Sequence, residues 1–166
     1  MKNGIPLHDT FGRPVNNLRI SLTQRCNFNC FFCHREGEQN AHDELSVEEV
    51  GRLVEIASSL GMRKIKLTGG EPLLREDIVN IVSRITPLVE EVSMTTNGAL
   101  LEKYAERLHE AGLKRANISL QSLDAEIFKK ITGCDDLDDV KKGIEATVEC
   151  SLEPVKLNVV VLKGLN

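Results

Sequence analysis

Short β-type runs alternate with segments of helical period along most of the chain, and this alternation is the strongest constraint on its fold. Five runs have the length and composition of strands, and each stretch between two of them carries apolar residues at helical spacing. Strands and helices that alternate at this interval form parallel βα units with right-handed crossovers. The sequence therefore predicts an α/β fold. The expected strands are Leu18–Thr23, Lys64–Thr68, Val92–Thr96, Asn117–Gln121 and Val155–Leu162.

Capping and breaking residues mark the expected helices. Ser46 and Glu49 have capping-box spacing at the start of an apolar stripe, which Gly61 ends. Two further stripes are closed by Pro87 and Gly112. The last two helices are expected at about Asp124–Ile131 and Leu137–Cys150.

Polar and apolar residues alternate within the strands, unlike the continuous apolar runs of parallel strands that are buried on both faces. Arg19 and Ser21 share one face of the first strand, and Lys64 and Lys66 share one face of the second. We expect a curved sheet whose apolar face packs on the helices and whose polar, locally cationic face lines a cavity. The alternative is a polar face left in water. The other polar-face residues are Thr23, Thr68, Ser93, Thr95, Asn97, Asn117, Ser119, Gln121, Lys156 and Asn158.

Composition is that of an ordinary globular protein. The 166 residues, with 41% hydrophobic and 28% charged side chains, suffice for one domain. A net charge of −4 argues against a nucleic-acid partner, although a few cations can still gather around one anionic ligand. No apolar run approaches the ~20 residues that cross a bilayer, and the polar first residues lack the apolar core of a signal peptide. We therefore expect a cytoplasmic protein with no membrane and no nucleic-acid partner.

Three of the five cysteines lie within eight residues, directly after the first expected strand. Cys26, Cys30 and Cys33 are thereby expected on the C-terminal rim of the strands, where βα barrels have their active sites. Three close thiolates hold three irons of an iron–sulfur cube and leave the fourth iron open to a chelating ligand. The alternative is a zinc site completed by His34 or His42, although zinc sites usually show paired Cys-x-x-Cys motifs.

The remaining cysteines are isolated. An odd number of cysteines without an export signal argues against a disulfide framework. Free cysteine commonly behaves as a small buried hydrophobe, so Cys134 and Cys150 are expected to be packed thiols.

Further polar motifs follow the other expected strands. Gly69-Gly70-Glu71-Pro72 follows the second strand, where glycines let the backbone approach a ligand and Glu71 adds a carboxylate. Thr95-Thr96-Asn97-Gly98 ends the third strand, and Ser119 lies in the fourth. Each motif alone is common in turns or polar strand positions, but all of them converge with the cysteines on one rim.

Together these motifs resemble those of the radical S-adenosylmethionine (SAM) superfamily. The Cys-x₃-Cys-x₂-Cys spacing, with Phe32 before the last cysteine, matches the cluster motif of that superfamily, and Gly69-Gly70-Glu71 matches its glycine-rich motif. The resemblance implies two cofactors, a 4Fe–4S cluster on Cys26, Cys30 and Cys33 and SAM at its open iron. It also implies that SAM is contacted by Phe32, Gly70, Glu71 and Ser119.

A closer resemblance, over essentially the whole chain, is to the GTP 3′,8-cyclase family of molybdenum cofactor biosynthesis. It is carried by stretches such as Arg25-Cys26-Asn27, Lys66 to Leu74 and Ile131-Thr132-Gly133, while Gln24 and Gln121 stand where the family usually has Asp. The resemblance implies a lyase that starts the radical cyclisation of GTP, with an electron donor for its cluster. It also implies that GTP is contacted by Arg19, Lys66, Thr95 and Lys156. Independently, a triphosphate would supply the anion that offsets the cations of the polar face, Arg19, Lys64, Lys66 and Lys156.

The same resemblance implies how the chain is organised. Residues 1–16 are expected to be an N-terminal extension, and residues 17–166 a radical SAM core built as a partial (βα) TIM-like barrel, with five of six βα units. The family continues into a sixth unit and a C-terminal region with a second cluster. We therefore expect the 166 residues to be an N-terminal part that does not complete the GTP reaction alone. Two rivals stay open: another radical SAM enzyme that modifies a peptide or small molecule, and a non-catalytic iron–sulfur or zinc carrier.

Overall fold

The computed structural model describes residues 7–34 and 44–166 of the chain. Five strands form one parallel sheet in which each strand pairs with its neighbours in sequence. This topology confirms the predicted α/β fold, a partial (βα) barrel. The strands are β1 (Asn17–Ser21), β2 (Lys64–Thr68), β3 (Glu91–Thr96), β4 (Arg115–Ser119) and β5 (Lys156–Asn158).

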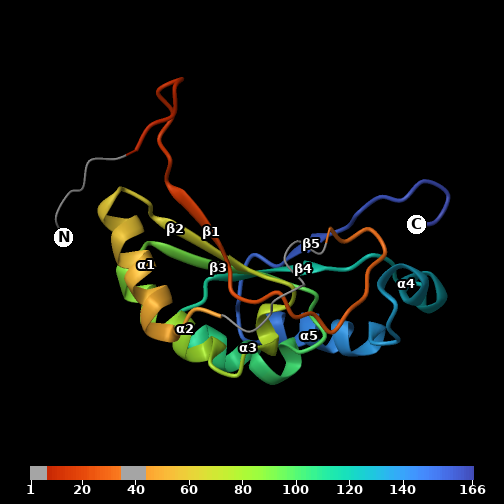
Figure 1. Ribbon diagram of the computed structural model, residues 1–166. Coiled ribbons are helices and arrows are strands. Elements are labelled where there is room, and N and C mark those ends of the chain that lie inside the picture. Colours follow the sequence, from red (N-terminus) through yellow and green to blue (C-terminus); the bar gives the residue numbers. More distant parts are fainter. Residues whose placement is uncertain (1–6, 35–43) are drawn as a thin grey trace.

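The α-helices cover one side of this sheet, as Figure 1 shows for α1, α2, α3 and α5. The longest helices have 13 residues. Within residues 7–34 and 44–166, no helix combines the length and the apolar character needed to cross a membrane. The helices are α1 (Val47–Ser59), α2 (Ile78–Ile85), α3 (Leu101–Glu110), α4 (Ala125–Thr132) and α5 (Leu137–Glu149), with 3-10 helices η2 (Pro72–Leu74) and η3 (Thr86–Leu88).

Local sequence signals account for the helix ends. At α1 the backbone N–H of Glu49 donates to Ser46 Oγ (3.3 Å), and the backbone N–H of Ser46 donates to Glu49 Oε2 (2.8 Å), which completes the predicted capping box. At α4 the Asp124 carboxylate accepts from the backbone N–H of Ile127 (2.9 Å), and Gly133 ends the helix in the left-handed conformation (φ 75°). The predicted helices are confirmed to within one or two residues at each end.

The alternation within the strands separates the core from the polar face. Ile65 and Leu67 of β2 are buried on the helix side with the rest of the hydrophobic core. On the opposite face the parallel register aligns polar residues of neighbouring strands. One row is Arg19, Lys66 and Ser93, and the next is Thr95, Asn117 and Lys156.

Strand β5 differs most from expectation, because it spans Lys156–Asn158 and not Val155–Leu162. The backbone N–H of Leu120 still donates to Asn158 O (3.0 Å), but the next regular donor, Val160 N–H, turns to the side-chain oxygen of Gln121 (2.9 Å). A side-chain acceptor replaces the main chain of β4 at this point, and the ladder ends.

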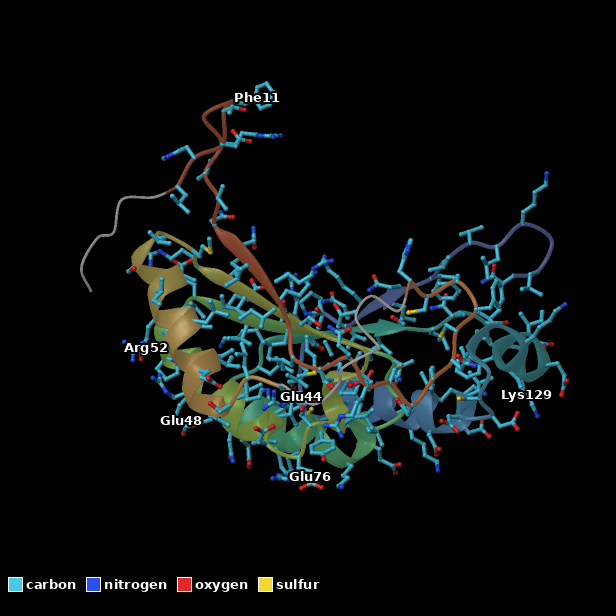
Figure 2. All side chains as sticks on the ribbon, in the orientation of Figure 1. Phe11, Glu44, Glu48, Arg52, Glu76 and Lys129 are labelled. Carbon is cyan, nitrogen blue, oxygen red and sulfur yellow. The ribbon has the colours of Figure 1, made fainter. Side chains whose placement is uncertain are left out.

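Residues 7–15 extend away from the sheet before β1 begins at Asn17, and Phe11 stands near their tip (Figure 2). His8 and Pro14 form an antiparallel bridge, and the Phe11 side chain is 82% exposed. The assignment of residues 1–16 to an extension stays a prediction.

We predict that Ala substitution has opposite effects at two helical glycines. In α5 a Cβ on Gly143 would lie 2.3 Å from the carbonyl oxygen of Gly98, which is backbone and cannot yield. Gly143→Ala should therefore lower the free energy of unfolding by about 1–3 kcal/mol, as overpacking does. In α1 a Cβ on Gly51 would meet the flexible, partly exposed side chain of Arg84. Gly51→Ala should stabilise by up to about 1 kcal/mol through helix propensity. Urea unfolding measures both, and equal effects would contradict the packing described here.

Candidate active site

A cavity of about 560 Å³ opens at the C-terminal rim of the strands. It is bordered by Arg19 and Ser21 of the polar face and by all three clustered cysteines. A second cavity, of about 240 Å³, shares the cysteines and extends along the rim to Thr95 and Ser119. The polar face therefore lines a cavity, as the strand pattern predicted.

The segment 26–33, here called the cluster loop, brings three free thiols to this cavity. Burial raises the pKa of Cys30 to about 11, with a further contribution from the neighbouring Cys26 and Cys33 thiols. Burial likewise raises the pKa of Cys26. The raised pKa values favour the protonated forms of Cys26 and Cys30 in the metal-free chain, so metal binding must release their protons.

The donor set fits an iron–sulfur cluster. Soft thiolates are the usual cluster ligands, and each of three thiolates binds a different iron of the cube. Because each thiolate binds a different iron, the three thiols can lie around one cavity without meeting at a single point. Cys26, Cys30 and Cys33 all border one cavity. In the described part of the chain, no three His, Cys, Asp or Glu side chains are grouped to hold a metal ion. Of the zinc alternatives, His34 borders the cavity, whereas His42 falls outside the described residues.

The two glycines after β2 are required by the chain itself. A Cβ on Gly69 would lie 2.6 Å from Thr23 O, and a Cβ on Gly70 would lie 2.2 Å from Arg25 O. The backbone N–H groups of Gly70 and Glu71 donate to these two carbonyls, each at 2.7 Å. The turn after β2 therefore packs closely on the backbone immediately before Cys26 and is hydrogen-bonded to it. Close approach to a ligand, the reason inferred from the sequence, stays a prediction beside this role within the chain.

Glu71 is buried beneath the rim, and its hydrogen bonds connect the turn after β2 to the end of β3. Its fully buried carboxylate accepts hydrogen bonds from the backbone N–H of Leu73 (3.0 Å), Thr96 Oγ1 (2.7 Å) and the backbone N–H of Asn97 (2.6 Å). Burial raises the pKa of Glu71, and the three donated hydrogen bonds oppose that rise. Glu71 borders neither of the two cavities at the rim, so its contact with SAM stays a prediction.

The other residues expected to contact SAM do reach the cavities. Gly70 and Phe32 border both, and Ser119 borders the second. The neighbouring Phe31 ring packs edge-to-face on Phe32 at 6.0 Å and is itself 59% exposed. Phe32 and Phe28 border both cavities, whereas Phe31 borders neither, and the contact of Phe32 with SAM stays a prediction.

Two polar contacts at the ends of the cluster loop had no signal in the sequence. The side-chain amide of Asn97 donates to Asn27 Oδ1 (2.7 Å). Glu44, labelled in Figure 2, accepts from Thr23 Oγ1 and from Arg25 Nε (3.1 Å). Each contact joins segments that are distant in sequence, so only the folded chain reveals them.

The predicted cations divide into two groups. Arg19 borders the main cavity and lies beside Lys66 in the register, and Lys156 lies further along the same face. These three side chains form no ion pair with another residue in 7–34 or 44–166. Thr95, the fourth residue expected to contact GTP, borders the second cavity.

Lys64 does not belong with these cations. Its Nζ lies 3.7 Å from one Glu91 oxygen, and the other Glu91 oxygen forms an ion pair with Arg115 at 2.6 Å. The sequence analysis missed both partners because its expected strands began at Val92 and Asn117. Extending the polar alternation one step back along each strand would have found them.

Cys134 also lies in an unexpected place. Its thiol donates to the backbone oxygen of Asn27 in the cluster loop (3.3 Å). Cys150 is half-buried beside the core, as expected of a packed thiol.

Proteins named probable GTP 3′,8-cyclase are similar to almost the whole chain. The Thermococcus kodakarensis protein is 61% identical over 161 residues, and the Archaeoglobus fulgidus protein is 52% identical over 160 residues. Each comparison covers 96% of this chain but only 52% and 54% of the respective relative. The chain thus spans about half the length of the curated relatives it matches.

Solved structures share the fold at lower identity. Streptococcus suis SuiB bound to precursor peptide SuiA has a TM-score of 0.76 at 24% identity, covering 89% of this chain and 33% of SuiB. The structure of anSMEcpe with bound AdoMet has a TM-score of 0.66 at 20% identity, covering 86% and 43%. Residues 20–166, which include the cluster loop and the whole rim, match the radical SAM superfamily. The chain belongs to the radical SAM superfamily.

Proposed function

We propose that Cys26, Cys30 and Cys33 hold a 4Fe–4S cluster and that the chain cleaves SAM to start the radical cyclisation of GTP in molybdenum cofactor biosynthesis. The cluster and SAM are the cofactors of this superfamily. The observation that carries the proposal is that three free thiols and Arg19, a cation with no ion pair among the described residues, border one cavity. The similarity to proteins named probable GTP 3′,8-cyclase supports the choice of substrate.

When bound, the cluster supplies the electron that splits SAM into methionine and a 5′-deoxyadenosyl radical, which takes a hydrogen atom from the substrate ribose. The residues of this chain position and shield that chemistry. Phe32 offers an apolar surface for the adenine ring, and Gly70 and Ser119 offer polar contacts along the same cavity wall. Glu71 joins the turn that carries Gly70 to the end of β3, through hydrogen bonds from Thr96 and Asn97. An external one-electron donor is the partner that this scheme requires.

GTP is proposed to bind along the polar face with its triphosphate toward Arg19, Lys66 and Lys156. Arg19 and Lys66 are register partners on β1 and β2, and Lys156 lies one row nearer the rim on β5. Cations without internal ion pairs attract a polyanion more strongly than paired ones do. Thr95 borders the second cavity. Its hydroxyl group would donate one hydrogen bond to the nucleotide or accept one from it.

Anaerobic reconstitution tests the cluster ligands. We expect about four irons and four sulfides per chain, and loss of the cluster when Cys26, Cys30 or Cys33 is replaced by Ala. Cys150→Ala and Cys134→Ala are the matched controls, and both should keep the cluster because neither thiol is a proposed ligand. Binding of one zinc without iron–sulfur absorption would instead favour the zinc carrier.

Product analysis tests the chemistry. The reconstituted chain, incubated anaerobically with SAM and a reductant, should release 5′-deoxyadenosine, and SAM should alter the EPR spectrum of the reduced cluster. An EPR spectrum that does not change when SAM is added, together with no formation of 5′-deoxyadenosine, would support a non-catalytic carrier.

Substitutions of Lys66 and Lys64, which lie two residues apart on the same face of β2, test the proposed GTP site. Lys66→Ala should weaken GTP binding about 10- to 100-fold, because a charge-assisted hydrogen bond contributes about 1.5–3 kcal/mol. Lys64→Ala is the control, since its charge is already engaged by Glu91. Isothermal titration of the reconstituted chain measures both affinities. Equal losses at the two positions would indicate a diffuse charge effect and contradict the proposed triphosphate position.

A further inference from the structure

The cluster loop rests on the C-terminal turn of α4, residues Ile131–Cys134, here called the α4 turn. The backbone N–H of Asn29 donates to Thr132 O (2.8 Å), and the backbone N–H of Phe31 donates to Ile131 O (3.2 Å). These carbonyls belong to the last turn of a helix, where acceptors lack intrahelical partners. The cluster loop therefore completes the end of α4, and α4 in turn fixes two amides of the loop.

Side chains reinforce this docking. The Phe28 ring meets the Phe128 ring of α4 edge-to-face, with centroids 5.8 Å apart and planes at 87°. The Cys134 thiol donates to the backbone oxygen of Asn27 (3.3 Å). Phe128 is fully buried, so its contact anchors the loop in the hydrophobic core.

Gly133 lets the two segments come this close. It has a φ of 75°, and a Cβ built on it would lie 3.2 Å from Asn29 Cβ. Any side chain at this position is strained by the backbone and also pushes against the middle of the cluster loop. The glycine is thus needed both to end α4 and to seat the loop.

The docking also occupies two backbone N–H groups of the cluster loop, whereas the N–H of Phe28 donates to the Cys26 sulfur (3.4 Å). Backbone N–H groups that donate to cluster sulfurs stabilise the added electron and raise the reduction potential. The N–H groups of Asn29 and Phe31 are occupied by helix carbonyls instead.

We propose that the α4 turn is a positioning element that seats the cluster loop and keeps the reduction potential of the cluster strongly negative. This inference rests on the proposed cluster ligands. It assigns a role to Ile131-Thr132-Gly133, a stretch that neither the cofactor contacts nor the GTP contacts use. A more negative potential makes the reduced cluster a stronger electron donor, as reductive cleavage of SAM requires.

The experiment compares Gly133→Ala with Gly112→Ala in the reconstituted chain. Gly112 follows α3, has a φ of 96°, and would place a Cβ 2.5 Å from Thr86 Cγ2, at the end of the sheet opposite the rim. Both variants should therefore lower the melting temperature. Only Gly133→Ala should also make the midpoint potential of the cluster less negative, in an EPR-monitored redox titration, and speed the removal of iron by a chelator. Gly112→Ala should match the unsubstituted chain in both.

An unchanged or more negative midpoint in Gly133→Ala would overturn the proposal, and so would the same shift in Gly112→Ala. If Gly133→Ala does not fold, Phe128→Leu and Cys134→Ala take its place, and each should shift the midpoint in the same direction while the iron content stays at that of the unsubstituted chain. Failure of the unsubstituted chain to take up iron and sulfide would instead refute the proposed ligands. The two failures are therefore distinguishable.

Discussion

The buried carboxylate of Glu71 is the interaction on which the arrangement of the rim depends. An ionised carboxylate inside a protein is costly by several kcal/mol unless donors surround it. Leu73, Thr96 and Asn97 provide three donors, from the loops after β2 and β3. Asn97 then holds Asn27, so the network reaches the cluster loop. Moving any of these loops leaves the buried carboxyl group short of hydrogen-bond partners, and the rim is therefore held as one unit.

Charge is distributed unevenly along the polar face of the sheet, so its positive potential is not the same at every position. At the base of the strands Glu91 lies between Lys64 and Arg115 and neutralises part of their charge. Toward the rim, Arg19, Lys66 and Lys156 have no acidic partner among the described residues. A chain with a net charge of −4 can in this way present a local positive field to a polyanion.

Parallel strand order brings these parts together. Every strand ends at the same edge of the sheet, so the cluster loop, the turn after β2 and the loop after β3 become neighbours although up to 70 residues separate them. The glycines of the turn after β2 serve this assembly first, because Gly69 and Gly70 let the turn touch the backbone of Thr23 and Arg25. The contacts between these loops are therefore formed by the chain itself, before any ligand binds.

The sequence by itself determined the helices, the succession of parallel βα units and the two faces of the sheet, because caps and periodicities are carried by residues a few positions apart. Ser46 with Glu49 marks the start of α1, and the alternation around Lys66 marks the polar face. It also indicated the cluster loop and Phe32 through their spacing. Only the tertiary structure showed that Glu71 is buried and that the cluster loop rests on α4. It also showed that Lys64 is paired with Glu91, whereas Lys66 has no ion pair within residues 7–34 and 44–166. Each of these depends on partners from another strand or loop, and the strength of a charge or hydrogen bond is set by the neighbours and the burial that folding supplies.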